Sequence, residues 1–494
     1  MSASPERPVV VIGAGPAGLT AAYELTRRGV PTLVVDQDAQ VGGLSKTVVY
    51  KGFRFDIGGH RFFTKVSSVR DLWHELLGAD LLRRPRLSRI LYGGRFFDYP
   101  LKAANVLRNL GPVTSAAVLA SYLRACARPI APETSFEDWV CNRFGRRLFD
   151  MFFRSYTEKV WGIPCREIGA QWAAQRIKGL SLWTAVLGML PGSSGGGVKT
   201  LIHEFEYPRL GPGMMWEACR DRVEAAGGRV ELRTRVLDLL HDGDAIHAVV
   251  LERGGERHVQ PAHHVISTMP IRHLVRGLSP APPDDVRAAA GRLKYRDFLT
   301  VALVVDRAAM FPDNWIYIHD PTVRVGRIQN FKNWSPEMVP DASLTCLGLE
   351  YFCSEGDDLW RMDDEALVAL GARELEAMGL LGAGRVVDAS VLRVFKASPV
   401  YDDGYGLALD TIREWTNRLT NLQLVGRNGM HKYNNQDHSM LTAQLAVRNL
   451  LGERHDLWAV NADEEYHEEG ETRALAASQP LVPRRAAAKL ELKS

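Results

Sequence analysis

The sequence predicts an α/β fold: a doubly wound, Rossmann-like nucleotide-binding domain interleaved with a helical domain and an antiparallel-sheet domain. Three observations predict it. A short apolar strand at Val9–Ile12 runs directly into a glycine-rich turn. Helical and alternating apolar patterns then succeed each other along the 494 residues, and strand patterns typical of the first domain return late in the chain. A chain of this length is expected to form two or three domains.

The glycine-rich turn has the spacing of a dinucleotide-binding motif. Gly13 permits a tight turn after the strand, Gly15 lets backbone N–H groups approach a pyrophosphate, and Gly18 lets the following helix pack closely. The second strand ends on Asp36, about twenty residues further on, where an acid accepts a hydrogen bond from a ribose hydroxyl. Strand, turn, helix and acid occur in the required order, so the motif predicts a dinucleotide cofactor.

The domain boundaries follow from shifts in pattern. The nucleotide-binding domain is expected to be discontinuous, because its strand patterns recur after long insertions. Thr134–Glu137 has the sequence of a capping box before a helix. The expected segments are 1–75, 205–275 and 415–455 for the nucleotide-binding domain, 76–190 for a helical domain with a mobile loop, 191–204 and 276–414 for the antiparallel-sheet substrate domain, and 456–494 for a C-terminal extension and tail.

Composition excludes several classes of protein. The net charge is +3, and no Lys/Arg-rich run with interleaved aromatic residues suggests nucleic acid. The sequence contains no stretch of eighteen apolar residues, so it predicts no membrane span. The six cysteines show neither a CxxC motif nor zinc spacing, which favours reduced thiols, no metal and a cytoplasmic location. The oligomeric state cannot be read from the sequence.

Two further glycine pairs suit a backbone that lies against a flat, bulky ligand: Gly42–Gly43 and Gly58–Gly59, the second followed by His60 and Arg61. With the first motif, they resemble the FAD-binding superfamily of amine oxidases, phytoene desaturases, protoporphyrinogen oxidases and UDP-galactopyranose mutases. Nicotinamide dehydrogenases lack the second glycine cluster. The resemblance therefore implies FAD as the cofactor.

Four later segments resemble the UDP-galactopyranose mutase family in chain order and separation. They are Tyr156-Thr-Glu-Lys-Val-Trp161 with Arg176 fifteen residues after the Trp, Arg327-Ile-Gln-Asn-Phe-Lys332, Glu350-Tyr351, and Arg427 followed by Tyr433 and Asn435. The resemblance spans residues 8 to about 455. It implies a mutase that interconverts the pyranose and furanose forms of a nucleotide-diphosphate hexose. In that family, reduced flavin N5 attacks the anomeric carbon and expels the diphosphate, and NAD(P)H or another reductant primes the flavin.

The resemblance also implies residue roles. Arg176 and Arg327 would hold the diphosphate, Tyr156 would stack on the base, and Trp161 would line the site. Tyr351 and Tyr433 would donate to phosphate, with Asn435 beside them. His60 would lie close to the isoalloxazine, so His60, Arg176 and Arg327 are the predicted catalytic residues. The predicted cofactor contacts are Gly13, Gly15, Gly18, Asp36, Gly43, Gly59, His60, Arg61, Val236 and Arg427.

Other interpretations stay open at this point. Tyr156 and Trp161 follow an apolar run and could belong to a core, Arg327 could be a solvated charge at a strand end, and His60 could be structural. The glycine motifs fit an FAD-dependent oxidase or desaturase equally well, with a mainly apolar substrate cavity, and a flavin-binding module without turnover is a third class. Phe63 stands where bacterial mutases carry a second histidine, so the nucleotide (UDP or GDP) and the hexose are undetermined.

Overall fold

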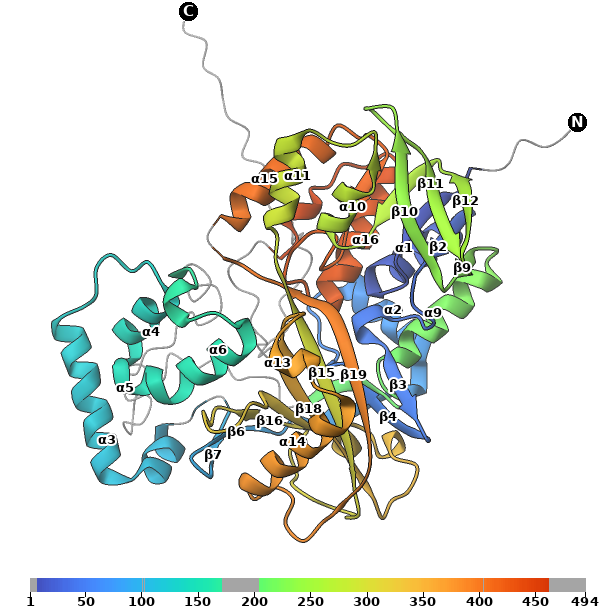
Figure 1. Cartoon of the computed structure of the whole chain (residues 1–494). Helices are drawn as coiled ribbons and strands as arrows, with labels where there is room; N and C mark the ends of the chain where they lie inside the picture. The colour runs from blue at the N-terminus through green and yellow to red at the C-terminus, as the bar shows by residue number, and fades with distance from the viewer. Residues whose placement is uncertain (1–6, 100, 102, 171–203, 403, 462–494) are drawn as a thin grey trace, which may run out of the picture.

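The computed structural model describes residues 7–99, 101, 103–170, 204–402 and 404–461. Its nucleotide-binding part contains a five-stranded parallel sheet in the order β20-β13-β1-β2-β9 (Figure 1). All residues of β1 and β2 are buried, as expected for parallel strands covered on both faces. The strands are β1 (Val9–Ile12), β2 (Thr32–Val35), β9 (Arg229–Glu231), β13 (His264–Ser267) and β20 (Leu422–Leu424).

Helices pack on this sheet and share one hydrophobic core with a second, smaller sheet in the order β12-β11-β10-β14. The helices are α1 (Pro16–Thr26), α2 (Ser67–Leu77), α9 (Gly213–Ala225), α10 (Ile271–Arg276), α11 (Asp284–Arg292), α15 (Tyr405–Thr416) and α16 (Gln436–Leu450). The strands of the smaller sheet are β10 (Thr234–His241), β11 (Ile246–Arg253), β12 (Glu256–Pro261) and β14 (Leu278–Ser279).

A seven-stranded sheet in the order β19-β15-β18-β17-β16-β6-β7 forms the second main body of the fold. Its neighbours pair antiparallel except β16 and β6. The strands are β6 (Ser88–Tyr92), β7 (Arg95–Asp98), β15 (Tyr295–Val305), β16 (Trp315–Ile318), β17 (Arg327–Asn330), β18 (Thr345–Cys353) and β19 (Val386–Pro399). Short α12 (Phe331–Trp334) follows β17, and α13 (Asp358–Arg361) and α14 (Asp364–Ala377) follow β18.

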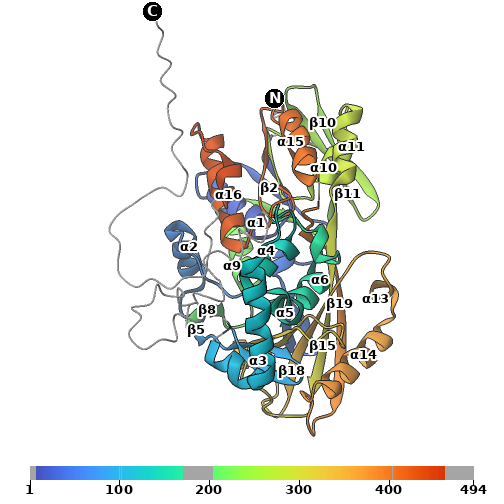
Figure 2. The ribbon, with the colours of Figure 1, turned by 90° about the vertical axis from the view of Figure 1, so that its left-hand side faces the viewer.

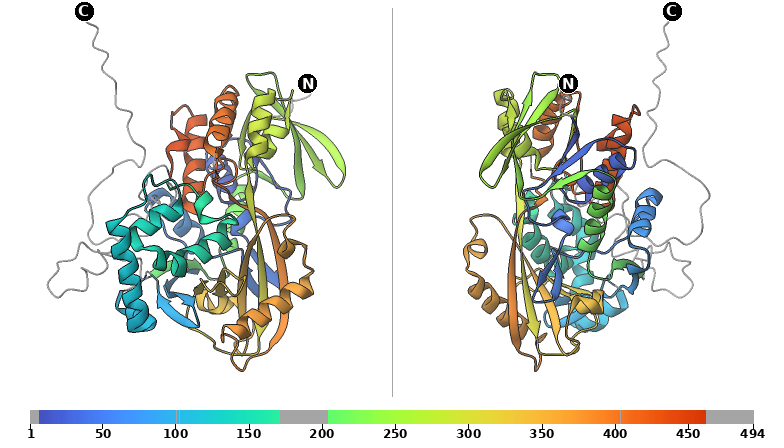
Figure 3. Two further views of the ribbon diagram at one scale, coloured as in Figure 1. Left: turned by 60° about the vertical axis from the view of Figure 1, so that its left-hand side comes forward. Right: turned by 90° about the vertical axis from the view of Figure 1, so that its right-hand side faces the viewer.

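The two faces of this sheet bury different groups. Leu299, Val301 and Leu303 of β15 pack with α14, which lies along the outer side of the sheet in Figure 3. Ala302 and Val304, which alternate with them, pack toward two pairs of short strands. Those pairs are β3 (Thr47–Tyr50) with β4 (Phe53–Asp56), and β5 (Leu81–Pro85) with β8 (Glu204–Pro208).

A helical group projects from one side of the molecule (Figures 1 and 2). Its helices are α3 (Ala103–Ala127), α4 (Phe136–Phe144), α5 (Arg146–Phe149) and α6 (Ser155–Trp161). The capping box of α4 lies one residue later than expected: Ser135 is the N-cap and Asp138 the reciprocal partner, because the Asp138 carboxylate reaches the Ser135 backbone N–H. No helix among the described residues is long and apolar enough to cross a membrane.

The segment 76–190, expected to be helical, begins with three strands. Strand β5 pairs with β8, while β6 and β7 form a hairpin that extends the seven-stranded sheet. Gly93 and Gly94 at its turn both have positive φ, 55° and 70°, which is the backbone conformation that a tight hairpin turn requires. The paired glycines between two apolar runs are the sequence feature that indicates a β-hairpin here. Residues 171–190 of this predicted segment, and residues 191–203 of the next one, lie outside the described part of the chain.

Candidate functional site

A cavity of about 480 Å³ extends from the turn between β1 and α1 to the face of the seven-stranded sheet. Segments far apart in the sequence line it. They include the glycine pairs near residues 43 and 58, strands β16, β17 and β18, and the loop before α16. The cavity therefore joins the predicted nucleotide-binding turn to the predicted substrate residues.

The turn between β1 and α1 is built for close packing. Gly13 has φ of +104°, and a Cβ there would lie 2.0 Å from Thr268 Oγ1. A Cβ on Gly18 would lie 1.8 Å from the Gly13 carbonyl oxygen, and one on Gly43 would lie 3.2 Å from the Gly15 Cα. Side chains at these positions would push the turn out of place, which agrees with the spacing argument.

Asp36 at the end of β2 is held by backbone donors. The Ala14 amide donates to Asp36 Oδ2 at 2.7 Å, and the Asp38 amide donates to Oδ1 at 2.8 Å. Burial raises the pKa of Asp36, and these two amide hydrogen bonds oppose that shift. The carboxylate is thereby fixed beside the N-terminus of α1, where Gly15 supplies no capping side chain. This arrangement fits the ribose and pyrophosphate of a dinucleotide such as FAD.

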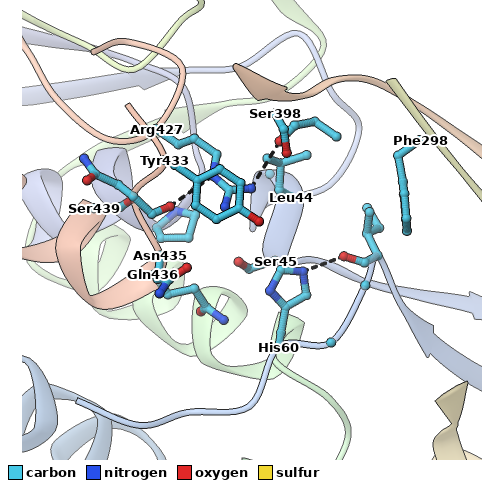
Figure 4. A pocket seen from close by; sticks show the side chains of 18 of the residues that line it. Leu44, Ser45, His60, Phe298, Ser398, Arg427, Tyr433, Asn435, Gln436 and Ser439 are labelled. Carbon is cyan, nitrogen blue, oxygen red and sulfur yellow. Dashed lines mark hydrogen bonds between the residues drawn. The ribbon is translucent and has the colours of Figure 1, made fainter. Parts of the chain in front are cut away.

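The middle of the cavity holds His60 and Arg427 (Figure 4). His60 Nε2 donates to the Ile57 carbonyl at 2.6 Å. Burial, together with the charges of Arg427 and Arg327, lowers the pKa of His60 to about 4, so the ring is neutral at pH 7. The Arg427 guanidinium donates to the carbonyls of Asn434 and Ala397, and it lies 4.2 Å from the centroid of the Tyr433 ring.

One face of the seven-stranded sheet forms the floor of the cavity at the end away from the turn between β1 and α1. Tyr317 on β16 pairs with Arg327 on β17, and Arg327 pairs with Glu350 on β18. Residues in register across strands point to the same side, and residues two apart along a strand share that side. The lining floor residues are Trp315, Tyr317, Arg327, Gln329, Glu350 and Phe352.

Arg327 is oriented by a buried carboxylate. Its Nε donates to Glu350 Oε2 at 2.5 Å, and Gln329 Nε2 donates to Glu350 Oε1 at 2.5 Å. The Glu350 side chain is 1% exposed and the Arg327 side chain 27%. Burial by itself would lower the pKa of Arg327, but the charge of Glu350 and the interactions with Tyr156, Tyr317 and Tyr433 together outweigh burial and raise the pKa. The result is a permanently charged guanidinium that faces a cavity.

Most of the predicted site residues line this cavity, but not all. Trp161 is 6% exposed and packs in a small core, yet one side of it lies on the cavity near Tyr433, with ring centroids 6.2 Å apart. Arg176 lies outside the described residues. The predicted residues that line the cavity are Gly15, Asp36, Gly43, Gly59, His60, Arg61, Trp161, Arg327, Arg427, Tyr433 and Asn435.

Three residues predicted to contact the cofactor or the substrate do not line this cavity. Tyr351 follows Glu350 on β18 and therefore points to the opposite face, where its hydroxyl donates to Glu374 Oε2 at 3.0 Å. Tyr156 stacks on His319 (4.7 Å between centroids) and lies behind Tyr317 rather than on the cavity wall. Val236 on β10 packs against the hydrophobic core and does not line the cavity.

Several lining residues were not predicted from the sequence. Strand register turns three of them toward the cavity, namely Trp315, Gln329 and Glu350. Gln329 could have been predicted, because it lies two residues after Arg327 and therefore on the same face of the strand. Lys332, which belongs to the Arg327 motif, is not among the lining residues. Its Nζ donates to the carbonyls of Ala308, Ala342 and Leu344.

The fold and the cavity define a class of α/β protein in which a Rossmann-like glycine turn and a separate seven-stranded sheet line one cavity. The chain belongs to the flavin-containing amine oxidoreductase family, whose model matches residues 16–407. A phytoene desaturase (lycopene-forming) from Pantoea ananas is 26% identical over 57% of this chain and 59% of its own length. A probable UDP-galactopyranose mutase from Klebsiella pneumoniae is 22% identical over 43% of this chain and 53% of its own length. The chain thus spans little more than half the length of these two curated relatives.

Solved structures extend the similarity to the whole fold. A crystal structure of reduced UDP-galactopyranose mutase superimposes with a TM-score of 0.80 at 22% identity and covers 93% of this chain and 98% of that one. A putative protoporphyrinogen oxidase from Exiguobacterium sp. 255-15 gives a TM-score of 0.69 at 18% identity, with 91% and 99% coverage. These superpositions show that the chain shares the FAD-binding amine oxidase-type fold.

Proposed function

We propose that this protein is an FAD-dependent mutase that interconverts the pyranose and furanose forms of a nucleotide-diphosphate hexose. The observation that carries the proposal is the charged Arg327 on the cavity floor, close to His60. A Cβ on Gly58 would lie 3.9 Å from Arg327 Nη2 and 4.0 Å from His60 Nε2. A fixed guanidinium at this point suits the diphosphate of a nucleotide sugar.

The residues that would hold FAD follow the cavity. Asp36 would accept from the ribose, the N-terminus of α1 would face the pyrophosphate, and His60 and Arg427 would flank the isoalloxazine. When bound and reduced, FAD supplies a nucleophilic ring nitrogen to the anomeric carbon, and NAD(P)H or another reductant primes it. The protein then contributes positioning and charge rather than a nucleophile of its own.

Arg327 would act on the leaving group. The diphosphate gains negative charge as the anomeric bond breaks, and a preoriented cation stabilises that charge without reorganising. Glu350 and Gln329 keep the guanidinium in one orientation through two short hydrogen bonds. His60 is neutral near pH 7 and therefore adds no competing charge beside the flavin.

The remaining predicted substrate residues have secondary roles in this proposal. Tyr433 and Asn435 lie at the loop before α16 and would meet the phosphates from the side opposite the floor. Trp161 would form the wall near Tyr433. Arg176 would add a second cation from residues outside the described part. We also propose that the enzyme acts on its nucleotide-sugar substrate in the cytoplasm.

An FAD-dependent oxidase or desaturase is the second candidate, and a specific observation favours it. The cavity is rich in aromatic side chains, which suit an apolar substrate, and a phytoene desaturase is among the relatives. The aromatic lining residues are Phe62, Phe63, Trp161, Phe298, Trp315, Tyr317, Trp334, Phe352 and Tyr433.

One experiment separates the two candidates. Dithionite-reduced protein is incubated anaerobically with UDP- and GDP-hexoses, and products are resolved by chromatography while reductant consumption is followed. A mutase forms an isomeric nucleotide sugar over many turnovers without consuming reductant in proportion. Consumption of one oxygen or one NAD(P)H per product, or no conversion of any nucleotide sugar, contradicts the mutase proposal.

A further inference from the structure

Helix α3 lies at the outer edge of the helical group and exposes large apolar side chains (Figures 1 and 2). Val113, Leu119 and Leu123 are 82%, 49% and 56% exposed. Together with Leu107 and Ile130, they are five of the thirteen large apolar side chains that are exposed in the described part of the chain. Single exposed apolar residues need no explanation, but their concentration in one segment marks a surface that binds something apolar.

The exposed side chains lie on one face of the helix. Helix α3 is interrupted at Gly111, where φ is 75°, and its longer part follows from Pro112. At about 100° per residue, the large side chains of this part fall within about 120° of the helix circumference. From Val113 on, every residue in that sector is exposed and apolar. These residues form the outer face of α3: Val113, Ala116, Leu119, Ala120, Leu123 and Ala127.

The opposite side of α3 already has its packing partners. Val118 and Tyr122 are 6% and 9% exposed. Val118 belongs to a small hydrophobic core that also contains Leu148 and Phe152. The helix is therefore anchored to the helical group through one side, and its outer face is left for a contact outside the described part of the chain.

The charge around the outer face is positive. Residues 99–132 contain no Asp or Glu, whereas Arg108, Arg124 and Arg128 are exposed. None of these three arginines forms an ion pair with a residue that the structure describes. Three acidic side chains elsewhere in the helical group are paired with other arginines: Glu133 with Arg143, Glu137 with Arg146, and Asp150 with Arg154.

We propose that the outer face of α3 binds the surface of an anionic phospholipid bilayer. Its apolar side chains enter the boundary between headgroups and acyl chains, and the arginines beside them contact lipid phosphates. An apolar helical face with a basic rim has the composition of a helix that lies in this interface without spanning the bilayer.

A second copy of the chain matches this surface less well than a bilayer does. It would bring the same acid-free segment, so the arginines of both copies would meet no opposite charge across the contact. No residue of the outer face lines the cavity. The inference is therefore independent of the proposed function.

Vesicle sedimentation tests the inference on the full-length, FAD-loaded protein. Phosphatidylcholine vesicles are compared with vesicles that also contain phosphatidylglycerol. Each arginine at an anionic surface strengthens binding about fivefold, so the mixed vesicles should bind the protein roughly tenfold or more tightly than the neutral ones. Added salt should reduce this difference, because it screens the surface charge.

Variants of the outer face and its rim should weaken binding to the anionic vesicles. Val113→Asp and Leu123→Asp each replace an apolar contact with a negative charge and should lower the partition coefficient about tenfold or more. Arg124→Gln should lower it about fivefold. Leu407→Asp, at a 74% exposed position of α15, and Arg222→Gln, at an exposed position of α9, are the matched controls and should change nothing. Flavin content and melting temperature should stay at the wild-type values in all five variants, because every position is exposed.

Several results would overturn the inference. The protein could stay in the supernatant with both kinds of vesicle, bind both equally, or bind unchanged when the outer face is altered. A dimer in sedimentation velocity that Val113→Asp converts to a monomer, with no binding to vesicles, would assign the face to contacts between copies. None of these results bears on the mutase proposal, because the assay with soluble nucleotide sugars measures it separately.

Discussion

Arg327 on β17 and Glu350 on β18 are cross-strand partners, and Arg327 Nε donates to Glu350 Oε2 at 2.5 Å. The pair places a charged guanidinium on the cavity floor and compensates the Glu350 carboxylate, which would otherwise be buried alone. One contact thus serves the proposed chemistry and the stability of the sheet, and the two contributions can be measured separately.

The conservative variant Arg327→Lys isolates the proposed chemistry. Lysine keeps the charge but loses the planar fork, so kcat/KM is expected to fall about ten- to a hundredfold with flavin content and melting temperature near those of wild type. Steady-state isomerisation of the nucleotide sugar measures it. Arg83→Lys, at an exposed position, is the control and should retain full activity. A folded, flavin-loaded Arg327→Lys enzyme with full activity would show that the guanidinium does not hold the diphosphate by its fork.

The stability of the pair is tested by a double-mutant cycle. Arg327→Ala leaves Glu350 buried without its cation and is expected to lower the free energy of unfolding by about 3 kcal/mol. Glu350→Gln in the same chain removes the charge, so the double variant should recover part of that loss. Chemical denaturation of the four proteins gives the coupling. Additive effects would mean that the two side chains do not stabilise each other.

FAD binding is expected to depend on Gly43 because a side chain there would crowd Gly15, and not only because of the backbone conformation of Gly43. Gly43 and Gly29 both have positive φ, +53° and +72°, but a Cβ at Gly43 would press on Gly15 at 3.2 Å, whereas a Cβ at Gly29 meets nothing within 4 Å. Gly43→Ala should therefore reduce the ratio of flavin to protein absorbance strongly, and Gly29→Ala should leave it unchanged. Equal flavin content in both variants would contradict this.

His60 predicts a pH dependence of stability. Its pKa is about 4 in the folded protein, below the ordinary value of 6.5, so the unfolded chain binds a proton between these values while the folded chain does not. The stability is therefore complete above about pH 6.5 and falls as the pH drops toward 4. Between pH 7 and pH 5, the melting temperature of His60→Gln should decrease by less than that of the wild-type protein. His258→Gln, at an exposed position, should behave like wild type.

Residues close together in the sequence were predicted well. The strand, the glycine turn, α1 and Asp36 lie within thirty residues of one another, and the turn itself excludes a side chain at Gly18, where a Cβ would meet the Gly13 carbonyl oxygen. The prediction failed where distant segments decide the structure. Strand β6 was included in a segment expected to be helical, because its partner β16 lies more than two hundred residues later. Tyr351 was placed on the substrate because its motif does not say which face of β18 it occupies.

The sequence by itself determined the glycine turn of the FAD-binding type, and it predicted a role for Arg327. Only the tertiary structure decided that Glu350, and not Tyr351, faces the cavity, that Glu350 orients Arg327, and that Arg61 lies over Trp315. The physical reason is that a turn depends on neighbouring residues, whereas the face that a strand residue presents depends on its register against strands from elsewhere in the chain.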